Sequence, residues 1–232
     1  MRKAYSAGGM LALAAAATLL IAGPVSAAVQ GQTYRGTVSP KKQSKTTFGG
    51  VSLTNIIDTS YQGFNPSPST TVIKFSKDIR FTPGKKPQCP LSSVQGKTTA
   101  AAKASCSSAV VGQGDVALNN GGLTGVVTAF NGIPSGGPTV ILHVDIGGAL
   151  FVDLSGKLNT KSNTLTVANI PNTPGSVLTH FAVTINKQKT GKKSFYVAAR
   201  CGKKKKWVNK ETTTYADGST TSATSVQKCK QK

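Results

Sequence analysis

Apolar and polar side chains alternate with a period of two along this 232-residue sequence, and the alternation narrows the choice of folds more than any other property. It is clearest where Leu142, Val144 and Ile146 alternate with His143 and Asp145. A β-strand points successive side chains to opposite faces, so this pattern predicts strands. Turn residues recur at close intervals, and no helical segments alternate with the strands. We predict an all-β fold: an antiparallel β-sandwich of Ig-like or Greek-key type, or alternatively a partly closed barrel.

Strands are expected over most of the chain after residue 50. We place them at residues 51–57, 71–75, 79–81, 110–118, 123–130, 140–146, 150–155, 178–186, 194–200, 207–215 and 220–226. Four hairpins are expected from consecutive strands, beginning with 110–118 and 123–130. In the third, strands 178–186 and 194–200 would pair across a lysine-bearing loop. The last, after residue 207, would turn at Asp217-Gly218.

The register of the hairpin between 140–146 and 150–155 can be deduced from its side chains. A two-residue Gly-Gly turn would set Leu142 opposite Asp153. A three-residue loop at 147–149 instead aligns Leu142 with Leu154 and sets His143 opposite Asp153. We predict the second register, because it gathers the apolar residues on one face.

Four cysteines indicate a covalent framework: Cys89, Cys106, Cys201 and Cys229. An even number of cysteines, in a chain whose N-terminus has the pattern of a signal peptide, is read most simply as two disulfides, and four cysteines allow three pairings. We predict the local pairs, 89 with 106 and 201 with 229, because short loops are the least costly to close. The 89–106 segment also contains the one expected helix, near its Ala-rich stretch. A zinc site is the rival, but the sequence has no Cys-x-x-Cys pair, so neither metal nor cofactor is expected.

The N-terminal residues have the three regions of a signal peptide. Arg2 and Lys3 precede an apolar run over residues 10–21, and small residues follow Gly23-Pro24. The run is shorter than the roughly 20 residues that a spanning helix needs. We therefore expect a signal peptide at residues 1–27, a flexible basic arm at 28–50 that contains one candidate strand at 33–38, and a single β domain at 51–232. The mature chain would be secreted, extracellular or associated with the cell envelope, with no stable membrane span.

Positive charge dominates the composition and is unevenly distributed. The chain has 28 Lys and Arg residues against 7 Asp and Glu. Residues 187–232 alone contain 13 basic and 2 acidic side chains. Such a field attracts polyanions. A surface whose charges are only solvated, with no bound partner, explains the composition equally well.

The proposed hairpins would gather basic residues of the C-terminal region into a polyanion-binding site. Its predicted members are Lys187, Lys189, Lys192, Arg200, Lys203, Lys204, Lys205 and Lys206. The partner would be an anionic cell-wall polymer or another polyanion. Recognition would not depend on base sequence, because lysine lacks the bidentate fork with which arginine reads bases. Trp207 and Tyr215 lie nearby in the sequence, but a tryptophan in a small sandwich is more often buried in the core than exposed in a binding site.

A second hypothesis is a secreted hydrolase with a site near His143 and Asp153. An aspartate opposite a histidine can orient the imidazole as a general base, and Ser155 is a diagonal neighbour. However, the sequence has no Gly-x-Ser-x-Gly turn, and its carboxylates are too scattered for a glycosidase. An ordinary polar pair is the simpler reading, so no catalytic residue is assigned.

Several short motifs resemble those of one group of proteins. They are Cys89-Pro90-Leu91-Ser92-Ser93, Gly96-Lys97-Thr98-Thr99, Cys106 with Val111-Gly112-Gln113-Gly114, Val127-Thr128-Ala129-Phe130-Asn131-Gly132, Ile141-Leu142-His143, Tyr196-Val197-Ala198-Ala199-Arg200-Cys201, Trp207 and Thr214-Tyr215-Ala216-Asp217-Gly218. With these, the chain resembles uncharacterised secreted proteins of high-GC Gram-positive bacteria (actinobacteria). The resemblance spans nearly all of the chain after the leader, but it implies no activity or binding residues. We therefore expect a secreted, non-catalytic β module with a binding or structural role; the sequence leaves its oligomeric state open.

Overall fold

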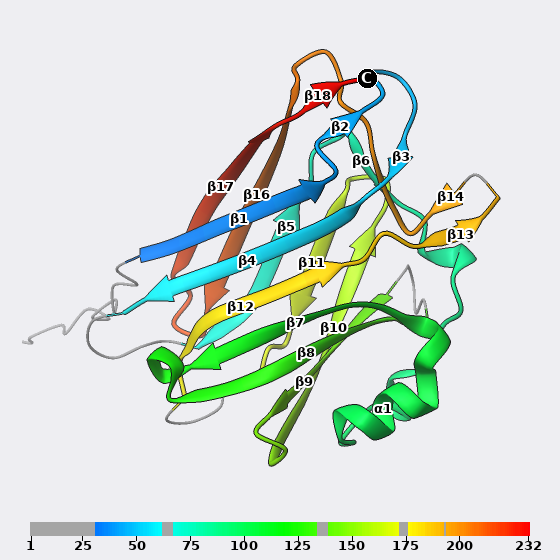
Figure 1. The fold of residues 1–232 in the computed structure, drawn as a ribbon. Coiled ribbons are helices and arrows are strands. Elements are labelled where there is room, and N and C mark those ends of the chain that lie inside the picture. Colours follow the sequence, from blue (N-terminus) through cyan, green and yellow to red (C-terminus); the bar gives the residue numbers. More distant parts are fainter. Residues whose placement is uncertain (1–30, 62–66, 134–138, 172–175, 193) are drawn as a thin grey trace, which may run out of the picture.

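A computed structural model describes residues 31–61, 67–133, 139–171, 176–192 and 194–232, and its main element is one strongly curved antiparallel sheet (Figure 1). The predicted signal peptide at residues 1–27 lies outside the described residues. The all-β prediction is confirmed, and the curvature brings the fold close to the barrel alternative.

The large sheet contains eleven of the described strands. In spatial order they are β1 (Gly31–Ser39), β4 (Ser52–Ser60), β12 (Leu178–Ile185), β7 (Val110–Leu118), β8 (Leu123–Asn131), β9 (Thr139–Ile146), β10 (Leu150–Asn159), β11 (Thr164–Ala168), β5 (Pro68–Lys74), β16 (Lys206–Tyr215) and β17 (Thr220–Lys228).

Side chains close the barrel between its two edge strands, β1 and β17. Gln227 on β17 bonds to both backbone groups of Val38 on β1: its Oε1 accepts from the Val38 N at 2.6 Å, and its Nε2 donates to the Val38 O at 3.1 Å. Ser225 Oγ donates to the Gly36 O at 3.2 Å. The edges are therefore joined through side chains, and exposed backbone groups of β1 gain partners.

Three small sheets complete the fold. The first joins β3 (Gly49–Gly50), β15 (Val197–Ala199) and β6 (Ile79–Phe81). The second pairs β2 (Lys42–Gln43) in parallel with β18 (Lys230–Gln231), and the third pairs β13 (Lys189–Gly191) with β14 (Ser194–Phe195). Figure 1 shows β2 and β18 at one end of the molecule and the β13–β14 hairpin at its side.

Three of the four predicted hairpins are confirmed: β7 with β8, β9 with β10 and β16 with β17. In the second, Leu142 lies opposite Leu154 and His143 opposite Asp153, which is the predicted register. Gly147 and Gly148 both have positive φ, 61° and 73°, a conformation that glycine adopts at little cost.

Two predictions are wrong. Strand 178–186 does not pair with 194–200, because β12 lies between β4 and β7, while β15 pairs with β6 and β3. Residues 31–50 of the expected flexible arm are ordered: β1 pairs along its whole length with β4, and β2 pairs with β18. A further strand, β11, was not expected.

One segment covers part of the outer face of the sheet. It contains α1 (Thr99–Cys106) and the short 3-10 helices Pro83–Lys85, Leu91–Ser93 and Ser107–Ala109; a fourth, Asn119–Gly121, lies in the β7–β8 turn. Residues from the segment pack on Phe130 and Ile141 of β8 and β9. Asp145 anchors the start of α1, because its Oδ2 accepts bonds from the N (3.2 Å) and Oγ1 (2.9 Å) of Thr99. Both predicted disulfides are present, Cys89–Cys106 and Cys201–Cys229.

Candidate functional site

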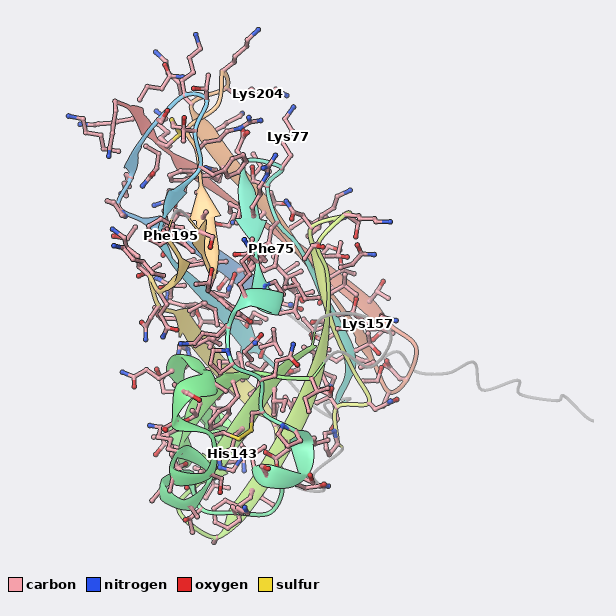
Figure 2. All side chains as sticks on the ribbon, turned by 90° about the vertical axis from the view of Figure 1, so that its right-hand side faces the viewer. Phe75, Lys77, His143, Lys157, Phe195 and Lys204 are labelled. Atoms are coloured by element: carbon pink, nitrogen blue, oxygen red, sulfur yellow. A yellow bond between two sulfur atoms is a disulfide. The ribbon has the colours of Figure 1, made fainter. Side chains whose placement is uncertain are left out.

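Ten exposed lysines meet at the end of the molecule where β2 and β18 pair. They come from three segments of the chain and are Lys41, Lys42, Lys45, Lys203, Lys204, Lys205, Lys206, Lys228, Lys230 and Lys232. We call this set the basic end. Figure 1 shows the C-terminus there, and the label of Lys204 in Figure 2 marks the same end from the side.

Backbone bonds and a disulfide hold the three segments together. The N of Lys230 donates to the O of Lys41 at 3.0 Å, and the N of Cys229 donates to the O of Lys205 at 2.9 Å. The N of Cys201, which is covalently bound to Cys229, donates to the O of Ser44 at 2.9 Å. The lysines therefore project from a fixed backbone, although each side chain is free to move.

Acidic groups do not neutralise the basic end. Asp78 is the nearest in the fold, since Arg200 lies beside Cys201, but it is buried and its Oδ1 accepts from Arg200 Nε at 2.7 Å. The chain has seven acidic residues. The other six lie in the barrel interior, below α1, in the β16–β17 turn or around His180. Lysine repulsion at this end is thus relieved mainly by solvent and ions.

An arginine pair borders the basic end. The guanidinium carbons of Arg80 and Arg200 lie 4.0 and 4.9 Å from the ring centroid of Phe48. Cation–π contact with one ring fixes both guanidinium groups in place.

The structure gathers only some of the predicted polyanion-binding residues. Lys203 to Lys206 belong to the basic end, and Arg200 borders it. Lys187, Lys189 and Lys192 lie on or beside the β13–β14 hairpin, which projects at the side of the molecule (Figure 1). They are separated because strand 194–200 does not pair with β12, as the prediction assumed.

Lysines of the N-terminal region were missed as site residues. Lys41 and Lys42 lie in the segment predicted to be a loose arm, and they reach the C-terminal lysines through the two-residue parallel pairing of β2 with β18. In the sequence around Lys41 and Lys42, positive charge is the only feature that indicates a binding site. A pairing this short leaves no periodic pattern from which it could have been found.

The two aromatic residues that lie near the basic cluster in the sequence are part of the core. Trp207 is 0% exposed and its Nε1 donates to the Arg200 O at 2.8 Å, and Tyr215 is 2% exposed. Neither ring can stack on a base at the surface. The basic end therefore does not offer Trp207 or Tyr215 as a surface on which the bases of a single-stranded nucleic acid could stack.

The His143–Asp153 pair exists but is covered. His143 Nδ1 lies 2.7 Å from Asp153 Oδ1, within hydrogen-bond distance. His143 is 0% exposed, and Asp153 Oδ2 accepts from the N of Gly96 in the covering segment. Among the described residues, His143 Nε2 has no hydrogen-bond partner. An imidazole enclosed in this way is not presented to a substrate.

A second histidine lies between two carboxylates on the outer face of β12. His180 Nδ1 is 2.5 Å from Asp58 Oδ1 on β4, and Nε2 is 3.0 Å from Asp115 Oδ2 on β7. Arg35 also contacts Asp58, at 3.4 Å. This cross-strand group was not predicted, because it depends on the placement of β12 between β4 and β7. In the described part of the chain, no group of three or more His, Cys, Asp or Glu residues is arranged to hold a metal ion.

Comparisons with protein families, with curated proteins and with solved structures found no match to the chain. Within the residues described, no helix is both long and apolar enough to cross a membrane.

Proposed function

We propose that the protein is an exported, non-catalytic β module that binds an anionic polymer through its basic end. The observation that carries the proposal is the convergence of ten exposed lysines from three chain segments, tied by the β2–β18 pairing and the Cys201–Cys229 disulfide. Export is supported by the signal-peptide pattern and by two disulfides, which persist in oxidising compartments. Its place would be the extracellular space or the cell envelope.

The chemistry favours a repeating phosphate or carboxylate polymer over a specific nucleic-acid site. Lysine binds as a point charge, and no lysine at the basic end is paired with an acid in the described structure. The buried Trp207 offers no stacking surface for a base. The hydrolase hypothesis is not favoured, since the covering segment encloses His143.

The salt dependence of binding tests this proposal. With immobilised inorganic polyphosphate as the probe and neutral dextran as the control, we expect binding to polyphosphate alone. Its affinity should fall by orders of magnitude between about 50 and 200 mM salt, because each neutralised phosphate releases counterions. Double-stranded DNA of different sequences should bind with equal affinities. Salt-insensitive binding, or no binding to polyphosphate at low salt, would contradict the proposal.

A further inference from the structure

The interior of the barrel contains two adjoining cavities, of about 110 and 90 Å³. They share five lining residues: Pro68, Leu154, Ile170, Leu178 and Phe181. Eight strands form a barrel that side chains just fill. A sheet of eleven strands encloses more space, so a cavity here follows from the strand number.

The lining is predominantly apolar. Leu142, Leu165 and Val183 contribute to the larger cavity, and Val144 and Val152 contribute to the smaller one. Several inward-facing apolar residues are only partly buried, among them Leu154 and Phe181. Cavities of this kind stay dry and accept apolar guests.

The two cavities follow one another along the barrel. On β9, Val140 and Leu142 line the larger, and Val144 and Ile146 line the smaller. Ile146 lies six residues after Val140 along the strand, a span of roughly 20 Å. An occupant of both cavities must therefore be long and narrow.

Among the described residues, apolar side chains lie around the end of this space that is opposite the basic end. Tyr215, at the far end of β16 from Lys206, pairs with Pro68, which lines both cavities. Leu123 and Leu150 lie opposite the lining residues Leu118 and Ile146 and share their face, yet they are 46% and 36% exposed. These exposed leucines continue the apolar lining to this end of the barrel.

Tyr196 is one of the residues that line the larger cavity. Tyr196 is 1% exposed, and its hydroxyl makes no hydrogen bond within the described structure. Other polar lining groups are bonded to one another, such as Thr71 to Thr213 at 2.9 Å. The backbone carbonyl of Tyr196 accepts from the N of Thr82, which directly follows β6. A buried hydroxyl without a partner is costly, so an oxygen atom of a ligand would stabilise it.

We propose that the barrel binds one uncharged long-chain lipid, an alcohol or an ester, with its chain along the two cavities and its oxygen bonded to the Tyr196 hydroxyl. The apolar wall matches the chain, the unpartnered hydroxyl matches a single polar head, and the exposed leucines continue the apolar lining to one end of the barrel. A charged head is disfavoured at this depth, because burying an unpaired charge costs far more than burying a hydroxyl.

Displacement of the neutral dye Nile red from the purified, disulfide-bonded protein tests the site, with 1-hexadecanol and hexadecane as competitors. Leu154 contributes to both cavities, so Leu154→Trp should weaken binding of both competitors by more than about tenfold. The control Val226→Trp changes an outer-face residue that is 58% exposed and should have no effect. Native mass spectrometry should show one hexadecanol molecule per chain.

Tyr196→Phe tests the polar contact without changing the shape of the cavity. It should weaken hexadecanol binding by about 3- to 10-fold, the value of one hydrogen bond, and leave hexadecane binding unchanged. Replacing Lys203 to Lys206 with glutamine should leave both affinities unchanged, which separates this site from the proposed polyanion site. The proposal is overturned if neither competitor displaces the dye, if Leu154→Trp binds like the wild type, or if Tyr196→Phe affects both competitors equally.

Discussion

Glu211 is a carboxyl group enclosed by the barrel, with 0% of its surface exposed. It accepts hydrogen bonds from Gln32 and Thr213. Burial raises the pKa of Glu211 to about 7, and the bond from Thr213 opposes this only in part. The same burial, together with the Glu211 charge, raises the pKa of Tyr34 above its ordinary value.

The raised pKa predicts a stability that falls as the pH rises. Between about pH 4.5 and 7 the folded protein keeps a proton on Glu211 that the unfolded chain has lost. The free energy of unfolding should therefore decrease through this window, by up to about 3 kcal/mol. Glu211→Gln cannot titrate and should remove this decrease, as measured by urea unfolding at several pH values.

Asp217→Asn is the matched control for Glu211→Gln. Asp217 is exposed, and hydrogen bonds from Ser219 hold its pKa below the usual range, so its titration lies at lower pH. The control should keep the wild-type decrease between pH 4.5 and 7. An unchanged pH dependence in Glu211→Gln would show that another group causes it.

Individual residues could be predicted from the sequence where their roles depend on neighbours within one hairpin. The pairing of His143 with Asp153 followed from a three-residue loop, and the Cys201–Cys229 disulfide followed from the short loop that it closes. The burial of His143 could not be predicted, since it depends on a segment some 45 residues earlier. Nor could the interior position of Glu211, which reads as one polar residue in an alternating strand.

Gly114 lets two strands approach closely. A Cβ atom at this position of β7 would lie 1.9 Å from the O of Ala182 on β12, a distance at which the backbone must shift. The glycine belongs to the Val111-Gly112-Gln113-Gly114 motif, which thus has a structural explanation. The β7–β12 contact joins segments that are distant in sequence, so this glycine supports the closure of the barrel.

Gly114→Ala should destabilise the protein by about 1–3 kcal/mol, because the methyl group overpacks the β7–β12 ladder. Gly84→Ala is the control: a Cβ there meets no atom within 4 Å, so its effect should stay within about 0.5 kcal/mol. Urea unfolding measures both. Equal stabilities of the two variants would mean that the β7–β12 ladder accommodates the added methyl group at no cost.

Strands joined by short turns could be predicted with their partners, and strands joined by long connections could not. The bounds of β7 are those predicted, and β8 ends one residue later. The neighbours of β4 are β1 and β12, and those of β5 are β11 and β16. Such pairings depend on long-range packing and leave no mark in the alternation of either strand. The third predicted hairpin is the exception: its strands are joined by a short loop, yet β12 pairs with the distant strands β4 and β7 instead.

The molecule as a whole is asymmetric along the barrel. One end carries ten exposed lysines and is covered by the β3–β15–β6 sheet, while the opposite end is rimmed by leucines. Composition predicted the excess of charge. Its concentration at one end depends on bringing residues 41–45 beside 203–206 and 228–232, which the sequence pattern does not indicate.

Two variants that lose equal charge at different places test the central claim most directly. One replaces Lys203, Lys204, Lys205 and Lys206 with glutamine; the other replaces Lys187, Lys189, Lys192 and Lys161, which lie outside the basic end. With polyphosphate as the probe, the first should bind much more weakly than the wild type. Its logarithmic salt slope should be smaller by roughly 3, whereas the second should stay close to the wild type. Exposed lysines contribute little to stability, so both should unfold at the wild-type urea concentration. Equal losses in the two variants would mean that overall charge, and not the basic end, determines binding.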